Sequence, residues 1–235
     1  MSTSFSLLCL PFAGAGASFY FPWRDRAADG IDVVPVQLPG RERLIAEDPY
    51  TDMHAAADRL AARLDPALKD RPVALFGHSL GAVLAFELAL RLEADGFDVV
   101  HLVASGSQGP WHGRTERAGD LDDDEFVARV REFAGYRHPA FDIPEMRELL
   151  LPTLRADVAM HESYVPTEGG RLRCDITSVR GVEDHLVSPE AAAGWALATA
   201  GTFHAVGVAG GHMYLEDDPA VALDAVAGAV GLLGI

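Results

Sequence analysis

The sequence predicts an α/β fold in which helices cover both faces of a mostly parallel sheet. Short apolar runs of strand length alternate with longer runs of helical pattern along most of the 235 residues. The strand-like runs are mostly apolar and do not alternate with polar residues, which is typical of parallel strands that are buried on both faces. Strands that alternate with helices in this way indicate a sheet built from crossover connections.

The expected elements follow one another along the chain. The runs predicted as strands are Phe5–Leu10, Ile31–Gln37, Val73–Phe76, Val99–Ser105, Cys174–Arg180 and Thr202–Val208. The runs predicted as helices are Ser18–Ala28, Met53–Leu64, Leu80–Asp95, Ser188–Thr199 and a final helix that opens at Asp218-Pro219. The last two begin with a capping residue followed by proline, a pair that favours a helix start because the first helical N–H needs no acceptor.

One region, from Gly106 to about Gly170, interrupts this alternation. It contains no convincing strand, but it carries helical runs such as Glu125–Phe133 and Pro144–Leu151. Its acidic run lacks the spacing and the closing Glu of a calcium loop, so we expect helix caps and a solvated helix start from Asp120, Asp122, Asp123 and Asp124. We therefore expect a single domain over residues 1–235, with a helical lid insertion at about 106–170 over the carboxyl ends of the strands.

Composition and charge narrow the class of protein. Hydrophobic residues make up 49% of the chain, and the net charge of −16 argues against nucleic acid or an anionic membrane as a partner. The N-terminal stretch has no basic region and no apolar run long enough for a signal peptide or a membrane span, so the expected compartment is the cytosol. Cys9 and Cys174 lie in strand-like runs and are expected to be buried free thiols.

The most informative motif is Gly-x-Ser-x-Gly at residues 77–81, between a predicted strand and a predicted helix. This setting predicts a nucleophile elbow and hence an α/β-hydrolase fold. Gly77 and Gly81 are required for steric reasons, because a Cβ at either position would collide where strand and helix come close. The turn exposes the hydroxyl of Ser79 and aims the N–H of Leu80 at the same point.

A serine nucleophile needs a base and an acid, which in this fold follow it in the order Ser, Asp or Glu, His. His212 is the predicted base because it lies in a glycine-rich loop after the last strand. Asp184 and Glu183 compete as the acid after Cys174–Arg180, and Asp184 is preferred because its shorter side chain holds an imidazole more rigidly. The remaining histidines are expected in the core, on the surface or in the lid: His54, His78, His101, His112, His138, His161, His185 and His204.

The oxyanion hole requires two backbone N–H groups. Leu80 is one predicted donor, and Phe12 in the loop after the first strand is the other, with Ala13 as the alternative to Phe12. The same loop contains Gly14-x-Gly16, but the nucleotide-binding fingerprint lacks its third glycine and its ribose-binding acid. Chemistry of this kind requires no metal and no redox cofactor.

Several segments together resemble the stand-alone (type II) thioesterases of polyketide and nonribosomal peptide assembly lines. Pro39-Gly40-Arg41 and Leu154-Arg155-Ala156-Asp157 are the most specific of them. The others are Leu10-Pro11-Phe12-Ala13-Gly14, Phe21-Pro22-Trp23, Phe76-Gly77-His78-Ser79-Leu80-Gly81-Ala82, Phe86-Glu87-Leu88-Ala89, Gly181-Val182-Glu183-Asp184 and Gly210-Gly211-His212-Met213-Tyr214-Leu215. Two loops depart from the family: Ala13 to Gly16 lacks adjacent glycines, and Gly106 to Pro110 lacks a commonly present arginine.

The resemblance implies hydrolysis of acyl thioesters from the phosphopantetheine arm of an acyl or peptidyl carrier protein, as an editing step that releases stalled or misprimed chains. Carrier proteins are usually acidic too, so docking should use a local apolar or basic patch. Arg41 and Arg43 are candidates for contacts near the entrance, or for an ion pair that fixes their loop. Arg155 and Asp157 are each expected to pin the lid to the body, unless one lines the channel.

We expect a monomer. The alternatives left open are a carboxylesterase or lipase for small esters, an acyltransferase, and a non-catalytic carrier-binding protein.

Overall fold

The computed structural model describes residues 4–113, 117–119, 121–134 and 139–231. Its centre is a parallel sheet, as predicted, and its strands lie in the order β2-β1-β3-β4-β5-β6. The strands are β1 (Phe5–Leu10), β2 (Ile31–Pro35), β3 (Val73–His78), β4 (Val99–Ser105), β5 (Asp175–Gly181) and β6 (Phe203–Val208). Every residue of β1 and β3 is buried, whereas the edge strands β2 and β6 are only partly covered.

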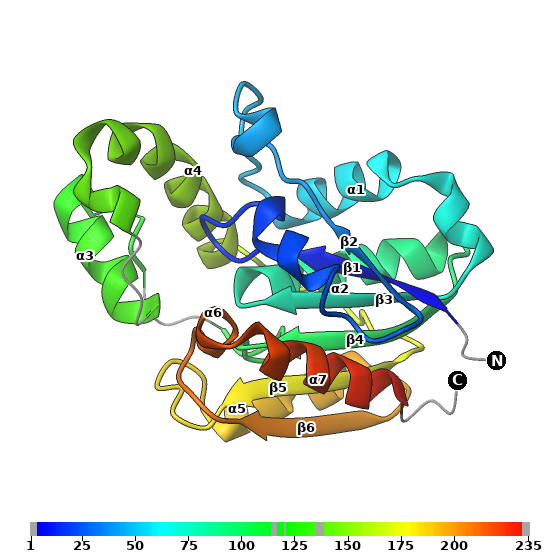
Figure 1. The fold of residues 1–235 in the computed structure, drawn as a ribbon. Coiled ribbons are helices and arrows are strands. Elements are labelled where there is room, and N and C mark those ends of the chain that lie inside the picture. The colour runs from blue at the N-terminus through cyan, green and yellow to red at the C-terminus, as the bar shows by residue number, and fades with distance from the viewer. Residues whose placement is uncertain (1–3, 114–116, 120, 135–138, 232–235) are drawn as a thin grey trace.

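Helices cover both faces of the sheet (Figure 1). The α-helices are α1 (Met53–Arg63), α2 (Leu80–Ala94), α3 (Asp123–Ala134), α4 (Pro144–Glu162), α5 (Pro189–Ala193), α6 (Tyr214–Asp217) and α7 (Pro219–Gly231). The 3₁₀ helices are η1 (Ala17–Trp23), η2 (Glu42–Leu44), η3 (Pro66–Asp70), η4 (Pro139–Asp142) and η5 (Gly194–Ala198). Alternate residues of a strand point to opposite faces, so Leu8 packs with α1 and α2, whereas Leu7 packs with η1 and α7.

Side-chain caps explain where several helices begin. Asp52 accepts the N–H of Ala55 at 2.7 Å at the start of α1, and Ser188 accepts that of Ala191 at 3.1 Å at the start of α5. Before α3, Asp122 accepts the N–H groups of the second and third residues after it, at 3.0 and 2.9 Å. The capping role predicted for the acidic run is confirmed at Asp122, and Asp120 lies outside the described residues.

Three predicted helices differ from the observed ones. The run Ser18–Ala28 forms only η1 and turns, because Pro22 has no N–H to donate to an α-helical ladder. The run Ser188–Thr199 divides into α5 and η5 at Gly194. Conversely, α4 continues through Pro152 to Glu162, so the predicted run Pro144–Leu151 is only the first half of one helix.

The helices α3 and α4 belong to the segment that follows β4 and stand at the carboxyl ends of the strands (Figure 1). They share a small apolar cluster that is separate from the two clusters of the sheet. Its buried members are Ala118, Phe126, Val127, Leu151 and Leu154, with Ala13 of the β1 loop packed against them. His138, one of the histidines expected on the surface or in the lid, lies outside the described residues.

Two further observations concern the chain as a whole. Among the described residues, no helix combines the length and the apolar character that are needed to cross a membrane. Cys9 and Cys174 are buried and free, as predicted, and burial raises the pKa of both thiols, that of Cys174 to about 12. Neither thiol is therefore a nucleophile at neutral pH.

Candidate active site

Ser79 lies on a strained turn between β3 and α2. Its φ of 52° and ψ of −117° fall in a region that non-glycine residues rarely adopt. A Cβ at Gly77 would lie 2.0 Å from the carbonyl oxygen of Gly81, and a Cβ at Gly81 would lie 2.5 Å from that of Leu10. The steric reason predicted for the two glycines is confirmed, and the same contacts bring the end of β1 against the elbow.

The two predicted oxyanion donors come from adjacent segments. Leu80 is the first residue of α2, and the first N–H groups of a helix have no acceptor within it. Phe12 is the second residue after β1, and its ring lies 5.9 Å from that of His78 in an edge-to-face arrangement. Ala13, the alternative donor, is partly buried. It packs against the apolar cluster around α1 and α2 and against the cluster that α3 and α4 share. The structure therefore brings Phe12 beside the elbow.

Asp184 and His212 are brought together by the loops after β5 and β6. Nδ1 of His212 donates to Oδ2 of Asp184 at 2.9 Å, and Oδ1 accepts the N–H groups of Leu186 at 2.8 Å and Val187 at 3.1 Å. Burial alone would raise the pKa of Asp184, but the hydrogen bond and charge of His212 and these N–H groups outweigh it and lower that pKa. Glu183 is exposed and donates its N–H to Gly210 instead, so the structure joins Asp184, not Glu183, to the histidine.

His78 connects the elbow to the histidine loop. Its ring is buried and lies 4.9 Å from that of His212. Burial, and then the proximity of His212, lower the pKa of His78 well below its usual value, so it stays neutral. Nδ1 of His78 shares a hydrogen bond with Ser105 at 2.8 Å, and Ser105 shares one with the hydroxyl of Tyr214 at 2.7 Å. His78 immediately precedes Ser79, so the His78–His212 ring contact brings the elbow close to the loop that carries His212.

Sequence reasoning did not find the chain from His78 to Tyr214. Ser105 is the last residue of β4 and lies opposite His78 in the register of the sheet. Tyr214 is two residues after His212. The sequence shows only that Ser105 is a polar residue at the end of a predicted strand. Its contact with His78 cannot be predicted until it is known that the two strands are neighbours.

The charged residues of α4 form two different contacts. Asp157 pairs with Arg41 of the loop after β2, so the predicted contact between the segment of Asp157 and the body, and the predicted ion pair that fixes the loop of Arg41, are both confirmed. Arg155 instead pairs with Asp123 of α3 and lies over the ring of Phe126, so the prediction that Arg155 pins the lid to the body is wrong. Its long side chain reaches along the lid rather than across to the sheet.

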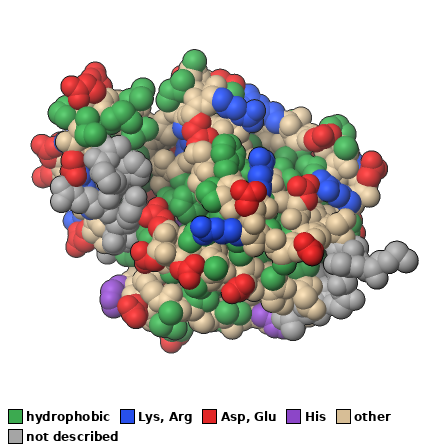
Figure 2. All heavy atoms as spheres, in the orientation of Figure 1, with side chains coloured by type: hydrophobic (Ala, Val, Ile, Leu, Met, Phe, Trp, Pro, Cys, Tyr) green, Lys and Arg blue, Asp and Glu red, His purple; other side chains and the backbone are tan. Residues whose placement is uncertain are grey.

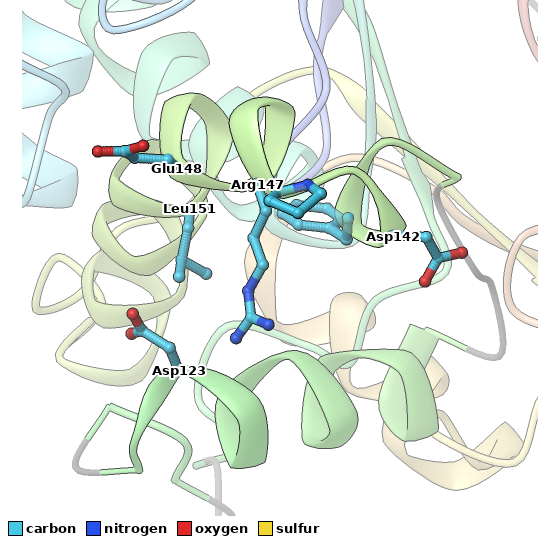
Figure 3. A pocket seen from close by; sticks show the side chains of 7 residues that line it. Asp123, Asp142, Arg147, Glu148 and Leu151 are labelled. Carbon is cyan, nitrogen blue, oxygen red and sulfur yellow. The ribbon is translucent and has the colours of Figure 1, made fainter.

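A hollow of about 310 Å³ opens between α3 and α4 (Figure 3). In Figure 3 the side chain of Arg147 projects into it and carboxylates stand around it. Its lining residues are Asp123, Phe141, Asp142, Pro144, Arg147, Glu148 and Leu151. A smaller cavity of about 40 Å³ is lined by Val83 of α2, Gln108 of the loop after β4 and Tyr164 after α4, among others. Val83 is one helical turn after Ser79, and Gln108 belongs to the loop where the sequence departs from the family that it resembles.

The fold and the Asp184–His212 pair define a class of protein. A serine on a strand-to-helix turn precedes an acid and a histidine, each in the loop after a later parallel strand, which is the arrangement of the α/β-hydrolase fold. The thioesterase domain family matches residues 5–230, and the chain belongs to this family of thioester hydrolases.

Individual relatives agree with the predicted resemblance, which is confirmed. The chain is 39% identical to a probable cadicidin biosynthesis thioesterase of Streptomyces griseus over 94% of its own length and 60% of the relative's. It is 38% identical to the type II thioesterase BorB of the borrelidin biosynthetic cluster, with a TM-score of 0.84 over 97% and 93% of the two chains. The prodiginine-pathway thioesterase RedJ of Streptomyces coelicolor superposes with a TM-score of 0.86 at 32% identity over 97% and 85%.

Proposed function

We propose that this protein hydrolyses acyl thioesters from the phosphopantetheine arm of an acyl or peptidyl carrier protein, as an editing enzyme of a polyketide or nonribosomal peptide pathway. The observation that carries the proposal is the hydrogen bond from His212 to Asp184 beside the elbow that bears Ser79. The names of the relatives supply the pathway context, since BorB and RedJ are thioesterases of biosynthetic clusters.

The first half of the reaction forms an acyl-enzyme. Ser79 Oγ attacks the thioester carbonyl while Nε2 of His212 takes its proton, and Asp184 stabilises the resulting imidazolium. The oxyanion of the tetrahedral intermediate accepts hydrogen bonds from the N–H groups of Phe12 and Leu80. The intermediate then collapses, the C–S bond breaks, and the imidazolium gives its proton to the departing thiolate.

The second half releases the acid. Water attacks the acyl ester of Ser79 as His212 takes one of its protons, and the same two N–H groups stabilise the second oxyanion. Collapse breaks the ester bond and returns the proton to Ser79 Oγ. The free acid leaves, and the carrier regains an unloaded thiol that can be charged again.

Docking of a carrier is proposed to use a local patch on the lid side. Acidic side chains are dispersed over the face shown in Figure 2, and basic ones form small isolated groups. Arg41 is buried and so takes no part in docking, whereas Arg43 is exposed. Ile143, the N-cap of α4, and Met146 and Leu149 in its first turns expose 50%, 39% and 51% of their surface at a spacing of three residues. This apolar stripe is the proposed contact.

We also propose that residues 1–235 form a single domain with a lid at about 106–170 and that the protein acts as a monomer. Two buried free thiols are consistent with a reducing compartment, so we place the reaction in the cytosol.

The experiment that tests the function is incubation with a panel of acylated carrier proteins, with Ser79→Ala as the control. We expect release of the free acid by the wild type, none by the variant, and labelling of Ser79 by a fluorophosphonate. Matched acyl-pantetheine thioesters and oxygen esters form a second arm. A strong preference for oxygen esters would identify a carboxylesterase, and product yields unaffected by Ser79→Ala would identify a non-catalytic binding protein. Transfer of the acyl group to a nucleophile other than water would identify an acyltransferase.

A further inference from the structure

Arg41 and Asp157 form a buried two-pronged ion pair between the body and the lid. Nη1 of Arg41 donates to Oδ2 of Asp157 at 2.8 Å, and Nη2 donates to Oδ1 at 2.7 Å. Only 5% and 1% of the two side chains are exposed. Removing two charges from water is costly, and an apolar pair of similar volume often stabilises a fold equally well. What the ion pair adds is a defined geometry.

The same two side chains also hold the loop after β1. Oδ2 of Asp157 accepts the N–H of Gly14 at 2.8 Å. Nη1 of Arg41 donates to the carbonyl of Ala15 at 2.8 Å, and its Nε donates to that of Pro39 at 3.3 Å. One guanidinium and one carboxylate therefore join three segments that are far apart in the sequence: the β1 loop, the loop after β2, and α4.

The loop that these bonds hold carries the proposed oxyanion donor. The carbonyl of Phe12 accepts the N–H of Ala15 at 3.0 Å, which closes a tight turn over residues 12–15. Gly14 has a φ of +78°, and a Cβ there would lie 3.1 Å from Cδ1 of Leu154 on α4. The turn that begins at Phe12 is thus held by α4 at Gly14.

We propose that the Arg41–Asp157 ion pair positions the oxyanion hole, holding the N–H of Phe12 in place only while α4 is seated on the body. Both are positioning residues, since neither contacts the reacting atoms in the mechanism above. The inference rests on the proposed function, because it takes Phe12 as an oxyanion donor. It couples two events: a lid that leaves the body also withdraws one of the two donors from the reaction.

Thr153 provides a matched control on the same face of α4, one turn before Asp157. Its hydroxyl donates to the carbonyl of Gly40 at 2.7 Å, so it joins α4 to the loop after β2 without touching the β1 loop. Thr153→Val removes only a contact between lid and body. Asp157→Asn keeps the shape of the side chain but removes the charge that Arg41 and Gly14 share.

The measurements are kcat and KM with octanoyl-N-acetylcysteamine, which needs no carrier, and Ki for an alkyl trifluoromethyl ketone, whose adduct with Ser79 carries the oxyanion. Misplacing one donor should cost somewhat less than deleting it, so we expect Asp157→Asn to lower kcat by about 10- to 100-fold with KM within about threefold. The Ki should rise by the same factor by which kcat/KM falls. Thr153→Val should change each quantity by less than about threefold.

Arg41→Lys keeps the positive charge but loses the planar guanidinium that donates to both carboxylate oxygens. We expect its kcat to lie between those of the wild type and Asp157→Asn. If circular dichroism shows that Asp157→Asn is unfolded, Arg41→Lys against Thr153→Val decides the question with the same readouts. The inference would be overturned if the ion-pair variants and Thr153→Val lost the same amount of activity, or if kcat fell without a rise in Ki. In either case an active wild type and an inactive Ser79→Ala would leave the proposed function standing. A wild type that fails to hydrolyse the thioester would instead overturn the proposed function, and the inference with it.

Discussion

Thr167 donates two hydrogen bonds to Glu87, one from its backbone N–H at 3.1 Å and one from its hydroxyl at 2.7 Å. The hydroxyl of Tyr164 donates to the same carboxylate at 2.8 Å, and Arg91 pairs with it from the next turn of α2. The side chain of Glu87 has no exposed surface. One buried carboxylate therefore fastens the segment that leaves α4 to α2, so the far end of the lid has its own anchor.

Glu87→Gln should destabilise the protein at neutral pH. Burial alone would raise the pKa of Glu87, but its hydrogen bonds with Thr167 and Tyr164 and the charge of His54 outweigh it and lower that pKa. A lowered pKa contributes stability above the unfolded value, and this contribution is lost as the pH falls through the folded value. We expect a loss of about 2–3 kcal/mol in urea unfolding at pH 7 that shrinks in acid.

Glu47→Gln is the matched control for this change, because Glu47 pairs with Arg63 at an exposed position. It should leave the unfolding midpoint unchanged. A Glu87→Gln loss that is the same at pH 7 and in acid would contradict the ionised state assigned to Glu87.

Asp184→Asn should lower kcat by about 10³- to 10⁴-fold, since an amide cannot hold the tautomer of His212 that leaves Nε2 free to act as a base. The KM should change little, because Asp184 is 3% exposed and lies behind the histidine. Steady-state kinetics on an acyl thioester give both values. Glu183→Gln, at the exposed neighbouring carboxylate, should keep full activity, and a comparable loss there would refute the assignment of the acid.

Gly181→Ala should reduce activity by separating two loops of the site. A Cβ at Gly181 would lie 2.3 Å from the carbonyl oxygen of Gly211 and 2.4 Å from that of Gly210, so the loop of His212 must move away from that of Asp184. We expect a fall in kcat of at least about tenfold, because small displacements of catalytic groups are costly. Gly228→Ala in α7, where a Cβ meets nothing within 4 Å, is the control and should retain activity and gain helix stability. Equal kcat in the two variants would contradict the prediction.

Glu216 should make the protein less stable as the pH rises. Burial, and then the charge of Asp217, raise its pKa from 4.5 to about 7, and its Oε2 is buried without a partner among the described residues. The folded state therefore keeps a proton that the unfolded chain releases, so stability falls between about pH 4.5 and pH 7. Glu216→Gln should raise the Tm at pH 8 and leave it unchanged at pH 4. A Tm difference that does not vary with pH, measured by thermal melts, would rule this out.

The parts of the fold that the sequence predicts are those governed by local pattern. An uninterrupted apolar run such as Val73–Phe76 could be placed as a strand because a parallel strand that is buried on both faces is apolar along its length. The sequence predicts only Pro144–Leu151 as a helix, because a proline such as Pro152 locally favours a helix end. In the structure α4 continues beyond Pro152, where Thr153 and Asp157 contact the body.

The candidate site also has parts that the sequence predicts and parts that it does not. Loop position and chain order are enough to name Ser79, Asp184 and His212, and the structure joins the last two by a hydrogen bond. The partner of Asp157 could not be named, because Arg41 is 116 positions away and only the folded chain brings the two together. The prediction that Arg155 pins the lid to the body is wrong for the same reason. Spacing along a helix shows which residues share a face, but not which neighbouring segment that face contacts.

The small apolar cluster between α3 and α4 makes the insertion a candidate for exchange between relatives. A transplanted segment would bring most of its own core, including Phe126 and Leu151, and would leave the three loops of the site to the host. The graft must still supply carboxylate and hydroxyl groups at the positions of Asp157 and Thr153, because these meet the host's loop after β2. Chimaeras built on that rule would test whether the segment can be exchanged while its contacts with the host's loops are kept.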